Sequence, residues 1–242
     1  MLKCENITKK FGGLWALAGV DLSVAEGEIV GLVGPNGSGK STLINVISGH
    51  YAPNAGRITF RGGDITARQP HQITRLGIAR TYQIPRPFQT MTAFENVAVA
   101  CMFGRSRAGV ADAQQNALHW LEVTGLGMCA NFPLEKLNLH QRRFLELARA
   151  LACGAELLLL DEVLAGLNPT EIELSMAMIR GINERGVSIL IVEHIMRAVV
   201  SLSHRIVVLD QGEVIAEGVS QQVMRDPAVI SAYLGKDYAR DH

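Results

Sequence analysis

The chain has 242 residues, 48% of them hydrophobic, and its 23 basic and 23 acidic side chains give a formal net charge of zero. This length allows one large α/β domain, or a domain with a smaller one inserted. The balanced charge gives no electrostatic reason to expect a nucleic acid or an anionic membrane as the partner. No apolar run approaches the length of a membrane-spanning helix, so we expect any membrane role to come from docking to another protein. The four cysteines lie far apart without metal-ligand spacing, which is typical of free thiols in a reducing cytoplasm.

The N-terminal segment, residues 2–24, favours short strands around a glycine turn at residues 12–13. Phe11 stands just before that turn, where it is either an ordinary core side chain or an aromatic that stacks on an adenine ring. A second turn, at residues 25–28, then leads into an apolar, strand-like run at residues 29–33.

Residues 34–41 fit the nucleotide-binding P-loop pattern, and residues 42–47 lead out of them as a helix. Glycines let such a loop adopt positive φ and bring backbone N–H groups against phosphate, which any Cβ would obstruct. The positive end of the following helix adds to the attraction for an anion. We expect Lys40 to reach the β- and γ-phosphates of ATP, and the Ser41 hydroxyl to ligate Mg²⁺. The residues predicted to hold the nucleotide are Gly34, Pro35, Asn36, Gly37, Ser38, Gly39, Lys40, Ser41 and Thr42.

The next part of the chain predicts a short strand at residues 57–60, a helix at residues 70–76 and a strand at residues 78–82. Gln83 ends this last strand, and a polar side chain at the carboxyl end of a parallel strand is well placed to face a ligand. Residues 89–137 then read as a mostly helical insert.

A further helix is predicted after this insert, with Asn138 as its N-terminal cap. Four consecutive leucines follow at residues 157–160 and fit a strand buried on both faces, as in a parallel sheet. The strand ends in Asp161 and Glu162, whose carboxylates either face a metal or polar cleft or mark a solvated strand end. With a P-loop upstream, we expect Asp161 on the Mg²⁺ side and Glu162 as the base that polarises the attacking water.

The last part of the chain continues the alternation of strands and helices. The predicted elements are a helix at 171–184, a strand at 188–192, a hairpin at 205–216 and short helical pieces within 221–234. His194 follows the strand at the carboxyl edge, a position that leaves a ligand-facing role open beside a core or surface one.

In this order, the motifs resemble those of the ATP-binding subunit of an ABC transporter, and the resemblance covers nearly the whole chain. It implies an α/β fold: a P-loop NTPase core with a mainly parallel sheet flanked by helices, an N-terminal antiparallel β subdomain and an inserted α-helical subdomain. Residues 1–242 would form this single ABC ATPase domain. The core and the β subdomain would occupy residues 1–88 and 138–242, and the helical subdomain residues 89–137.

The resemblance also implies roles for the matching residues. Phe11 would be the adenine-stacking aromatic, Gln83 would link Mg²⁺ and the attacking water to the helical subdomain, and His194 would sense the γ-phosphate. Residues 165–168 would cross the interface of a head-to-tail dimer. A signature segment would complete the ATP site of the opposite subunit, and its residues are Leu137, Asn138, Leu139, His140 and Gln141. The implied catalytic residues are Lys40, Gln83, Glu162 and His194, and the implied Mg²⁺ ligands are Ser41, Gln83 and Asp161.

Four stretches resemble the branched-chain amino-acid importer ATPases in particular: residues 76–83, 165–171, 192–194 and 229–235. ATPases that import urea or short-chain amides, or export lipopolysaccharide, share much of this pattern. The resemblance implies a second, identical or related ATPase subunit, membrane permease subunits that dock near residues 83–94, and a solute-binding protein in the full system. It implies no nucleic-acid partner, and it places the chain peripherally on the cytoplasmic face of the membrane.

The signature segment departs from the family's usual Leu-Ser-Gly-Gly-Gln. Asn138 can still donate a hydrogen bond from its amide. His140 replaces a glycine, so it adds bulk and restricts positive φ, although its ring can donate to phosphate when protonated. The rival hypothesis is therefore a regulatory subunit that binds ATP but does not activate its partner's ATP. A soluble ABC ATPase acting on DNA or ribosomes, or a P-loop kinase, explains fewer of the motifs.

Overall fold

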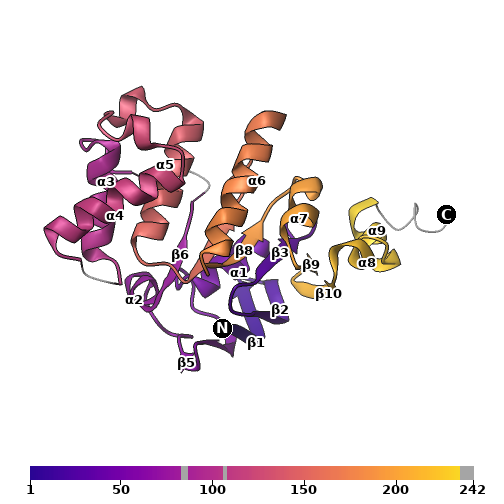
Figure 1. Ribbon diagram of the computed structural model, residues 1–242. Coiled ribbons are helices and arrows are strands. Elements are labelled where there is room, and N and C mark those ends of the chain that lie inside the picture. The colour runs from indigo at the N-terminus through magenta and orange to yellow at the C-terminus, as the bar shows by residue number, and fades with distance from the viewer. Residues whose placement is uncertain (83–86, 106–107, 235–242) are drawn as a thin grey trace. The chain divides into compact units, whose positions relative to one another are not determined.

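The structure, a computed structural model, describes residues 1–82, 87–105 and 108–234 (Figure 1). The chain divides into two compact units, each described here by itself. The first comprises Met1–Pro70 and Ser188–His242, and the second comprises His71–Val187. The division of the chain into residues 1–88 and 138–242 with a helical insert at residues 89–137 stays a prediction.

In the first unit, an antiparallel sheet is built from the N-terminal strands, in the order β2-β1-β4-β5. Its strands are β1 (Leu2–Phe11), β2 (Leu14–Val24), β4 (Ala55–Phe60) and β5 (Gly63–Asp64). β1 and β2 form the predicted hairpin around the glycine turn, with Leu2 opposite Val24 and Phe11 opposite Leu14. The predicted N-terminal antiparallel β subdomain is thus confirmed.

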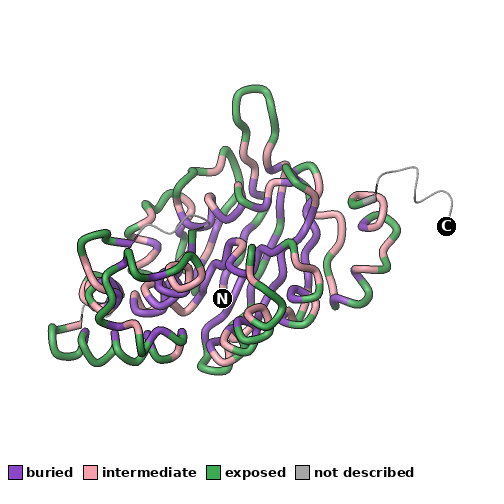
Figure 2. Tube along the Cα trace, turned by 90° about the horizontal axis from the view of Figure 1, so that it is seen from above, coloured by how far each residue is buried: buried purple, intermediate pink, exposed green. Residues whose placement is uncertain are grey.

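The same unit contains four further strands in the order β10-β9-β3-β8, with β3 central and parallel to both of its neighbours. These are β3 (Ile29–Val33), β8 (Ser188–Val192), β9 (Arg205–Asp210) and β10 (Glu213–Gly218). Every residue of β3 and β8 is buried, as expected for parallel strands covered on both faces (Figure 2). The helices of this unit are α1 (Lys40–Ile47), α7 (Met196–Leu202), α8 (Ser220–Val223) and α9 (Pro227–Leu234).

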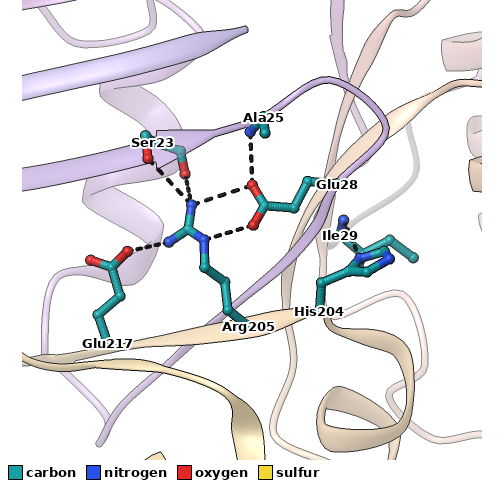
Figure 3. A network of polar contacts seen from close by, with 7 residues as sticks. All are labelled: Ser23, Ala25, Glu28, Ile29, His204, Arg205 and Glu217. Carbon is teal, nitrogen blue, oxygen red and sulfur yellow. Dashed lines mark hydrogen bonds and ion pairs between the residues drawn. The ribbon is translucent and has the colours of Figure 1, made fainter.

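A polar network holds the turn that precedes β3 (Figure 3). The Arg205 guanidinium donates to the Glu28 carboxylate, with Nε 2.7 Å from Oε1, and also binds Glu217 and Ser23. The Ile29 N–H donates to His204 Nδ1 at 3.0 Å. The network ties the end of β2 and the start of β3 to β9 and β10, which holds in place the strand that carries the P-loop.

The second unit combines two parallel strands with a group of helices. β6 (Ile78–Arg80) pairs in parallel with β7 (Leu157–Asp161), and all residues of β7 are buried. α3, α4 and α5 lie side by side, with both α4 and α5 in contact with α3 (Figure 1). The helices are α2 (Pro70–Leu76), α3 (Ala93–Phe103), α4 (Val110–Val123), α5 (Leu139–Ala152), α6 (Pro169–Glu184) and the 3₁₀ turns Gly127–Cys129 and Leu134–Lys136.

Candidate functional site

The P-loop of the first unit needs glycine at two positions. Gly34 has a φ of 149°, and a Cβ there would lie 1.9 Å from the Leu209 carbonyl oxygen. Gly39, the N-cap of α1, has a φ of 109°, and a Cβ there would lie 2.5 Å from the Ala16 carbonyl oxygen. A side chain at either position would strain the backbone, because φ is positive, and its Cβ would clash with a backbone carbonyl oxygen. The loop conformation therefore depends on these glycines.

The Lys40 side chain, almost completely buried, is held within the loop. Its ammonium group donates to the Gly34 and Pro35 carbonyl oxygens, each at 2.8 Å, and lies 3.4 Å from Ser38 Oγ. These carbonyls place the positive charge at the first turn of α1, where the helix dipole also favours an anion. A bound phosphate would therefore meet both the ammonium group and the helix N-terminus.

A cavity of about 630 Å³ opens against this loop, within the first unit. Its volume lies in the range of small-molecule sites, about 300–1,000 Å³. The P-loop and the start of α1 form one part of its lining, and the start of β2 forms another. The lining residues are Gly13, Leu14, Trp15, Ala16, Gly37, Ser38, Gly39, Lys40, Ser41, Thr42 and Gln211.

Phe11 lies outside this lining set and packs on another aromatic ring. Its ring meets that of Tyr51 edge-on, at 5.2 Å between centroids, and the Lys9 ammonium group lies 5.2 Å from its centroid. The Phe11 side chain nevertheless remains partly exposed. Its role as the adenine-stacking aromatic stays a prediction.

His194 follows β8 in the first unit and is exposed. Leu32 of β3 stands opposite Val192 of β8 in the parallel register. The carboxyl ends of the two strands therefore meet at one sheet edge, from which the P-loop also begins. His194 thus emerges at the edge that carries Lys40.

In the second unit, Asp161 ends β7 and forms a buried ion pair. Its Oδ2 lies 2.8 Å from Arg80 Nη2, and the two side chains are only 7% and 10% exposed. The Arg80 guanidinium also lies 5.2 Å from the centroid of the Tyr82 ring. The Asp161 carboxylate is thus buried. Carboxylates of this kind bind Mg²⁺ in proteins together with the phosphates of a nucleotide.

No group of three or more His, Cys, Asp or Glu side chains suited to a metal ion occurs among the residues that the structure describes. A metal ion bound by the Asp161 carboxylate would have to compete with Arg80 for it.

Glu162, the next residue, has a φ of 53°, in the left-handed region that residues other than glycine rarely adopt. Such a conformation costs of order 1–3 kcal/mol and is found most often at functional sites. The Ala165 N–H donates to the Glu162 carbonyl oxygen at 3.3 Å, which helps to hold the turn. The predicted base is therefore a strained residue at the point where the chain leaves β7.

The signature segment begins α5, and Asn138 is its predicted cap. Asn138 Oδ1 accepts from the Gln141 N–H at 2.8 Å, and Gln141 Oε1 accepts from the Asn138 N–H at 2.9 Å. This reciprocal capping box satisfies two backbone donors at the helix start. The Asn138 side-chain oxygen is thus committed to its own helix.

His140 packs within its own unit. Its ring meets Phe144 edge-on, at 4.4 Å between centroids, and its Nδ1 lies 3.7 Å from Glu171 Oε1. Burial lowers the pKa of His140; Glu171 raises it in part, and Arg143 lowers it further. The protonated form, which would donate most readily to phosphate, is therefore disfavoured.

The loop at residues 165–168 is attached to the same helix. The Arg143 side chain donates to the Ala165 carbonyl oxygen. Asn168 caps α6 in a second capping box, whose other member is Glu171. The start of α5 and the loop before α6 are thus linked through two side chains of α5, His140 and Arg143.

Gln83 lies outside the described residues, as do residues 84–86 of the predicted permease-docking stretch. In the described remainder of that stretch, the backbone of Phe88 is held by the buried side chain of Asn96, which follows the stretch in α3. Its Oδ1 accepts from the Phe88 N–H at 2.8 Å, and its Nδ2 donates to the Phe88 carbonyl oxygen at 3.1 Å.

The ABC transporter family profile matches residues 17–165. The chain is 39% identical, over 98% of both chains, to the "High-affinity branched-chain amino acid transport ATP-binding protein BraF" of Pseudomonas aeruginosa. The chain belongs to the ABC transporter family, as an ATP-binding subunit. It is also 38% identical to LivG of Escherichia coli strain K12, a high-affinity branched-chain amino acid transport ATP-binding protein, over 98% of both chains. A second profile, that of the branched-chain amino acid ATP-binding cassette transporters, matches residues 213–239.

Solved structures agree with this assignment. The ADP conformation of an ATP-binding cassette superposes with a TM-score of 0.87 at 32% identity, covering 98% of this chain and 99% of that one. A nucleotide-free cassette gives a TM-score of 0.84 at 30% identity, over 98% and 99% of the two chains. The predicted α/β P-loop NTPase fold is confirmed. Within the described residues, no helix combines the length and apolar character needed to span a membrane.

Sequence reasoning missed several residues of this ABC ATPase. Trp15, Arg80 and Asn96 belong to no sequence motif. Trp15 lines the cavity, Arg80 pairs with Asp161 and Asn96 binds the Phe88 backbone, and short-range sequence patterns predict none of these contacts. An arginine within a predicted buried-type strand, as at position 80 in the strand predicted at residues 78–82, is the only sequence signal among them.

Proposed function

We propose that this ABC ATPase binds and hydrolyses Mg-ATP to power uptake of branched-chain amino acids across the cytoplasmic membrane. The observation that carries this proposal is the similarity over 98% of the chain to BraF and LivG, whose names specify branched-chain amino acid transport. The match of the C-terminal segment, residues 213–239, supports the same solute class. These similarities favour branched-chain amino acids over urea, short-chain amides or lipopolysaccharide.

Hydrolysis in this proposal rests on positioning and charge stabilisation, as phosphoryl transfer requires. Lys40 neutralises the β- and γ-phosphates, and His194 contacts the γ-phosphate from the neighbouring strand end. Ser41 and Asp161 are the Mg²⁺ ligands, with Gln83 as the third proposed contact. When bound, Mg²⁺ would supply positive charge that offsets the negative charge of the phosphates. Glu162 accepts a proton from the attacking water.

The proposed assembly is a head-to-tail pair of ATPase subunits. A relative of 29% identity with a TM-score of 0.81 over 91% of this chain and 99% of that one is a dimer bound to ADP and Pi. In the proposal, residues 137–141 complete the ATP site of the second subunit. Permease subunits dock near residues 83–94, which places the chain peripherally on the cytoplasmic face, and a solute-binding protein delivers the amino acid.

The test is steady-state ATP hydrolysis by the purified chain as its concentration is varied. The proposal expects a rate that rises faster than linearly with concentration, because the active species is a dimer. Glu162→Gln should keep ATP binding and lose at least about a hundredfold in turnover, as expected for removal of a general base. Full turnover by this variant would remove Glu162 from the mechanism, and absence of ATP binding by the natural chain would contradict the function itself.

The packing of His140 favours a second candidate, a regulatory subunit. The ring stands where the family has glycine, and Phe144 and Glu171 hold it in place. In this case the chain binds ATP but activates its partner's ATP poorly. His140→Gly should then raise turnover of the self-dimer. If turnover is unchanged, the histidine is not a sufficient cause of weak activity.

A further inference from the structure

The turn between β9 and β10 brings a polar residue to the nucleotide cavity from the C-terminal part of the first unit. Asp210 pairs with Glu213 across this hairpin, so the turn has two residues, Gln211 and Gly212. Gln211 is exposed and belongs to the lining of the cavity, together with the P-loop and the start of β2. An amide side chain from outside the P-loop therefore stands in the cavity wall.

Backbone hydrogen bonds fix the place of this turn. The Gly212 N–H donates to the Ser38 carbonyl oxygen of the P-loop at 2.9 Å, and the Gly212 carbonyl oxygen accepts from the Ala18 N–H of β2 at 2.9 Å. A Cβ at position 212 would lie 2.9 Å from the Ala16 carbonyl oxygen, so this close approach requires glycine. The turn is thus joined to the phosphate-binding loop on one side and to β2 on the other.

The backbone conformation of Gln211 is shared by a second turn of the same unit. Gln211 and Gly212 have φ values of 46° and 84°, and two-residue hairpin turns with positive φ at both positions favour asparagine or glycine at the first. Arg61 and Gly62, between β4 and β5, have φ values of 51° and 78°. Arg61 lies outside the lining of the nucleotide cavity. Contact with the cavity therefore distinguishes Gln211, and positive φ does not.

The lining on either side of the turn indicates which part of a nucleotide Gln211 meets. The P-loop side, with Lys40 and the N-terminus of α1, suits phosphate, and the β2 side, with Leu14 and Ala16, is apolar. The sugar of a nucleotide lies between its phosphates and its base, and each sugar hydroxyl can donate and accept a hydrogen bond. The Gln211 amide offers two donors and an acceptor, so its chemistry and its place between the two sides fit the sugar.

We propose that Gln211 hydrogen-bonds with a hydroxyl group of the nucleotide sugar and gives the site a preference over nucleotides that lack this hydroxyl. This inference rests on the proposed function, because it assumes that a nucleotide occupies the P-loop cavity. It adds to the site a residue of the β9–β10 turn, outside the motifs that the sequence singles out.

The experiment uses the full chain and compares Gln211→Gly with Arg61→Gly, which makes the corresponding change in the turn outside the cavity. Each variant is titrated by calorimetry, in the presence of Mg²⁺, with ADP, 2′-deoxy-ADP, 3′-deoxy-ADP and inorganic tripolyphosphate. Gln211→Gly should weaken ADP binding roughly two- to tenfold, as for the loss of one hydrogen bond. Its binding of tripolyphosphate, and of the analogue that lacks the contacted hydroxyl, should be unchanged. Arg61→Gly should leave all four affinities unchanged.

Thermal unfolding separates this role from a structural one. Glycine adopts positive φ without strain, so both glycine variants should match or exceed the Tm of the natural chain. A variant that is as stable as the natural chain but binds ADP more weakly has lost a contact with the ligand and not its fold. Gln211→Met, which keeps a side chain of similar length without the amide, should show the same loss for ADP.

Four outcomes overturn the inference. Unchanged ADP affinity in Gln211→Gly removes the side chain from the site, and full ADP affinity in Gln211→Met removes the amide from the contact. Equal losses for all four ligands mean that the turn acts through the P-loop. Equal losses for ADP and both deoxy analogues, with tripolyphosphate unchanged, place the contact on the base.

The proposed function is tested separately by Lys40→Ala, which should lose both ADP and tripolyphosphate. A natural chain that binds neither ligand refutes both proposals. A natural chain that binds ADP and its deoxy analogues equally well refutes the sugar contact alone.

Discussion

At the scale of single residues, both members of the predicted acidic pair are held by their surroundings. Asp161 is compensated by Arg80 in a buried ion pair, and Glu162 adopts a left-handed backbone conformation. A buried carboxylate without a partner is strongly unfavourable, whereas an exposed ion pair contributes little. The two kinds of pair can be compared directly, since Arg57 and Asp64 form an exposed one at 2.9 Å.

Arg80→Ala is therefore expected to lower the free energy of unfolding by about 3–5 kcal/mol, because it leaves the Asp161 carboxylate buried and uncompensated. Arg57→Ala, the matched control, should cost no more than about 1 kcal/mol. Urea unfolding followed by circular dichroism measures both. Equal losses in the two variants would show that Arg80 does not compensate Asp161.

At the scale of elements, the start of α5 depends on the side chain that caps it. Because Asn138 and Gln141 satisfy each other's backbone N–H groups, Asn138→Ala should destabilise the protein by about 0.5–2 kcal/mol. Asn138→Ser, which also places the family's usual residue there, should keep most of the stability, since serine caps helices as well as asparagine does. A serine variant as unstable as the alanine variant in thermal unfolding would argue against the cap.

The turn before β3 gives a second element-scale prediction, on pH. Burial by itself raises the pKa of Glu28, but hydrogen bonds from the Arg205 side chain and the Ala25 N–H, with the nearby positive charge, bring the pKa below its usual value. The unfolded chain then binds the proton more readily, so the contribution of Glu28 to stability is full above its ordinary pKa and is lost as pH falls through the folded pKa.

The Tm difference between the natural chain and Glu28→Gln, measured from neutral pH down to about pH 3, checks this expectation. The difference should shrink as the solution is acidified, because the carboxylate becomes protonated in the natural chain. The Glu217→Gln variant, which leaves the Arg205–Glu28 contact in place, is the control. A difference that is constant across this range would contradict the role of the charge.

At the scale of the whole molecule, nucleotide binding should be visible as stability, because a ligand that binds only the folded chain shifts the unfolding equilibrium. Mg-ATP at a hundred times its Kd should add about 2.7 kcal/mol, or roughly 5–10 °C in Tm for a chain of this size. Glu162→Gln is the suitable background, because it is expected not to consume the ATP. Lys40→Ala should show no shift, and a shift as large as that of the parent would place ATP outside the P-loop.

Local patterns were enough to predict much of this protein. The P-loop, the buried strands at residues 29–33, 157–160 and 188–192, and the Asn138 cap follow from residue types at short spacing, where chain geometry limits the choices. The fold class and the family followed from the order of these motifs. The strand predicted at residues 78–82 ends at Arg80 in the structure, although the Thr81 N–H still donates to the Leu159 carbonyl oxygen at 3.0 Å.

Other features were decided only by the tertiary structure. The Arg80–Asp161 pair joins residues 81 positions apart, and the Arg205–Glu28 contact joins residues 177 positions apart. Trp15 meets the P-loop only because the hairpin folds back beside α1, and His140 meets Glu171 only because α5 and α6 begin close together. Sequence periodicity describes which face of an element is apolar, but it does not specify which distant side chain that face will meet. Pairing between distant elements therefore decided the partner of Asp161, the surroundings that lower the pKa of His140, and the residues of the cavity wall.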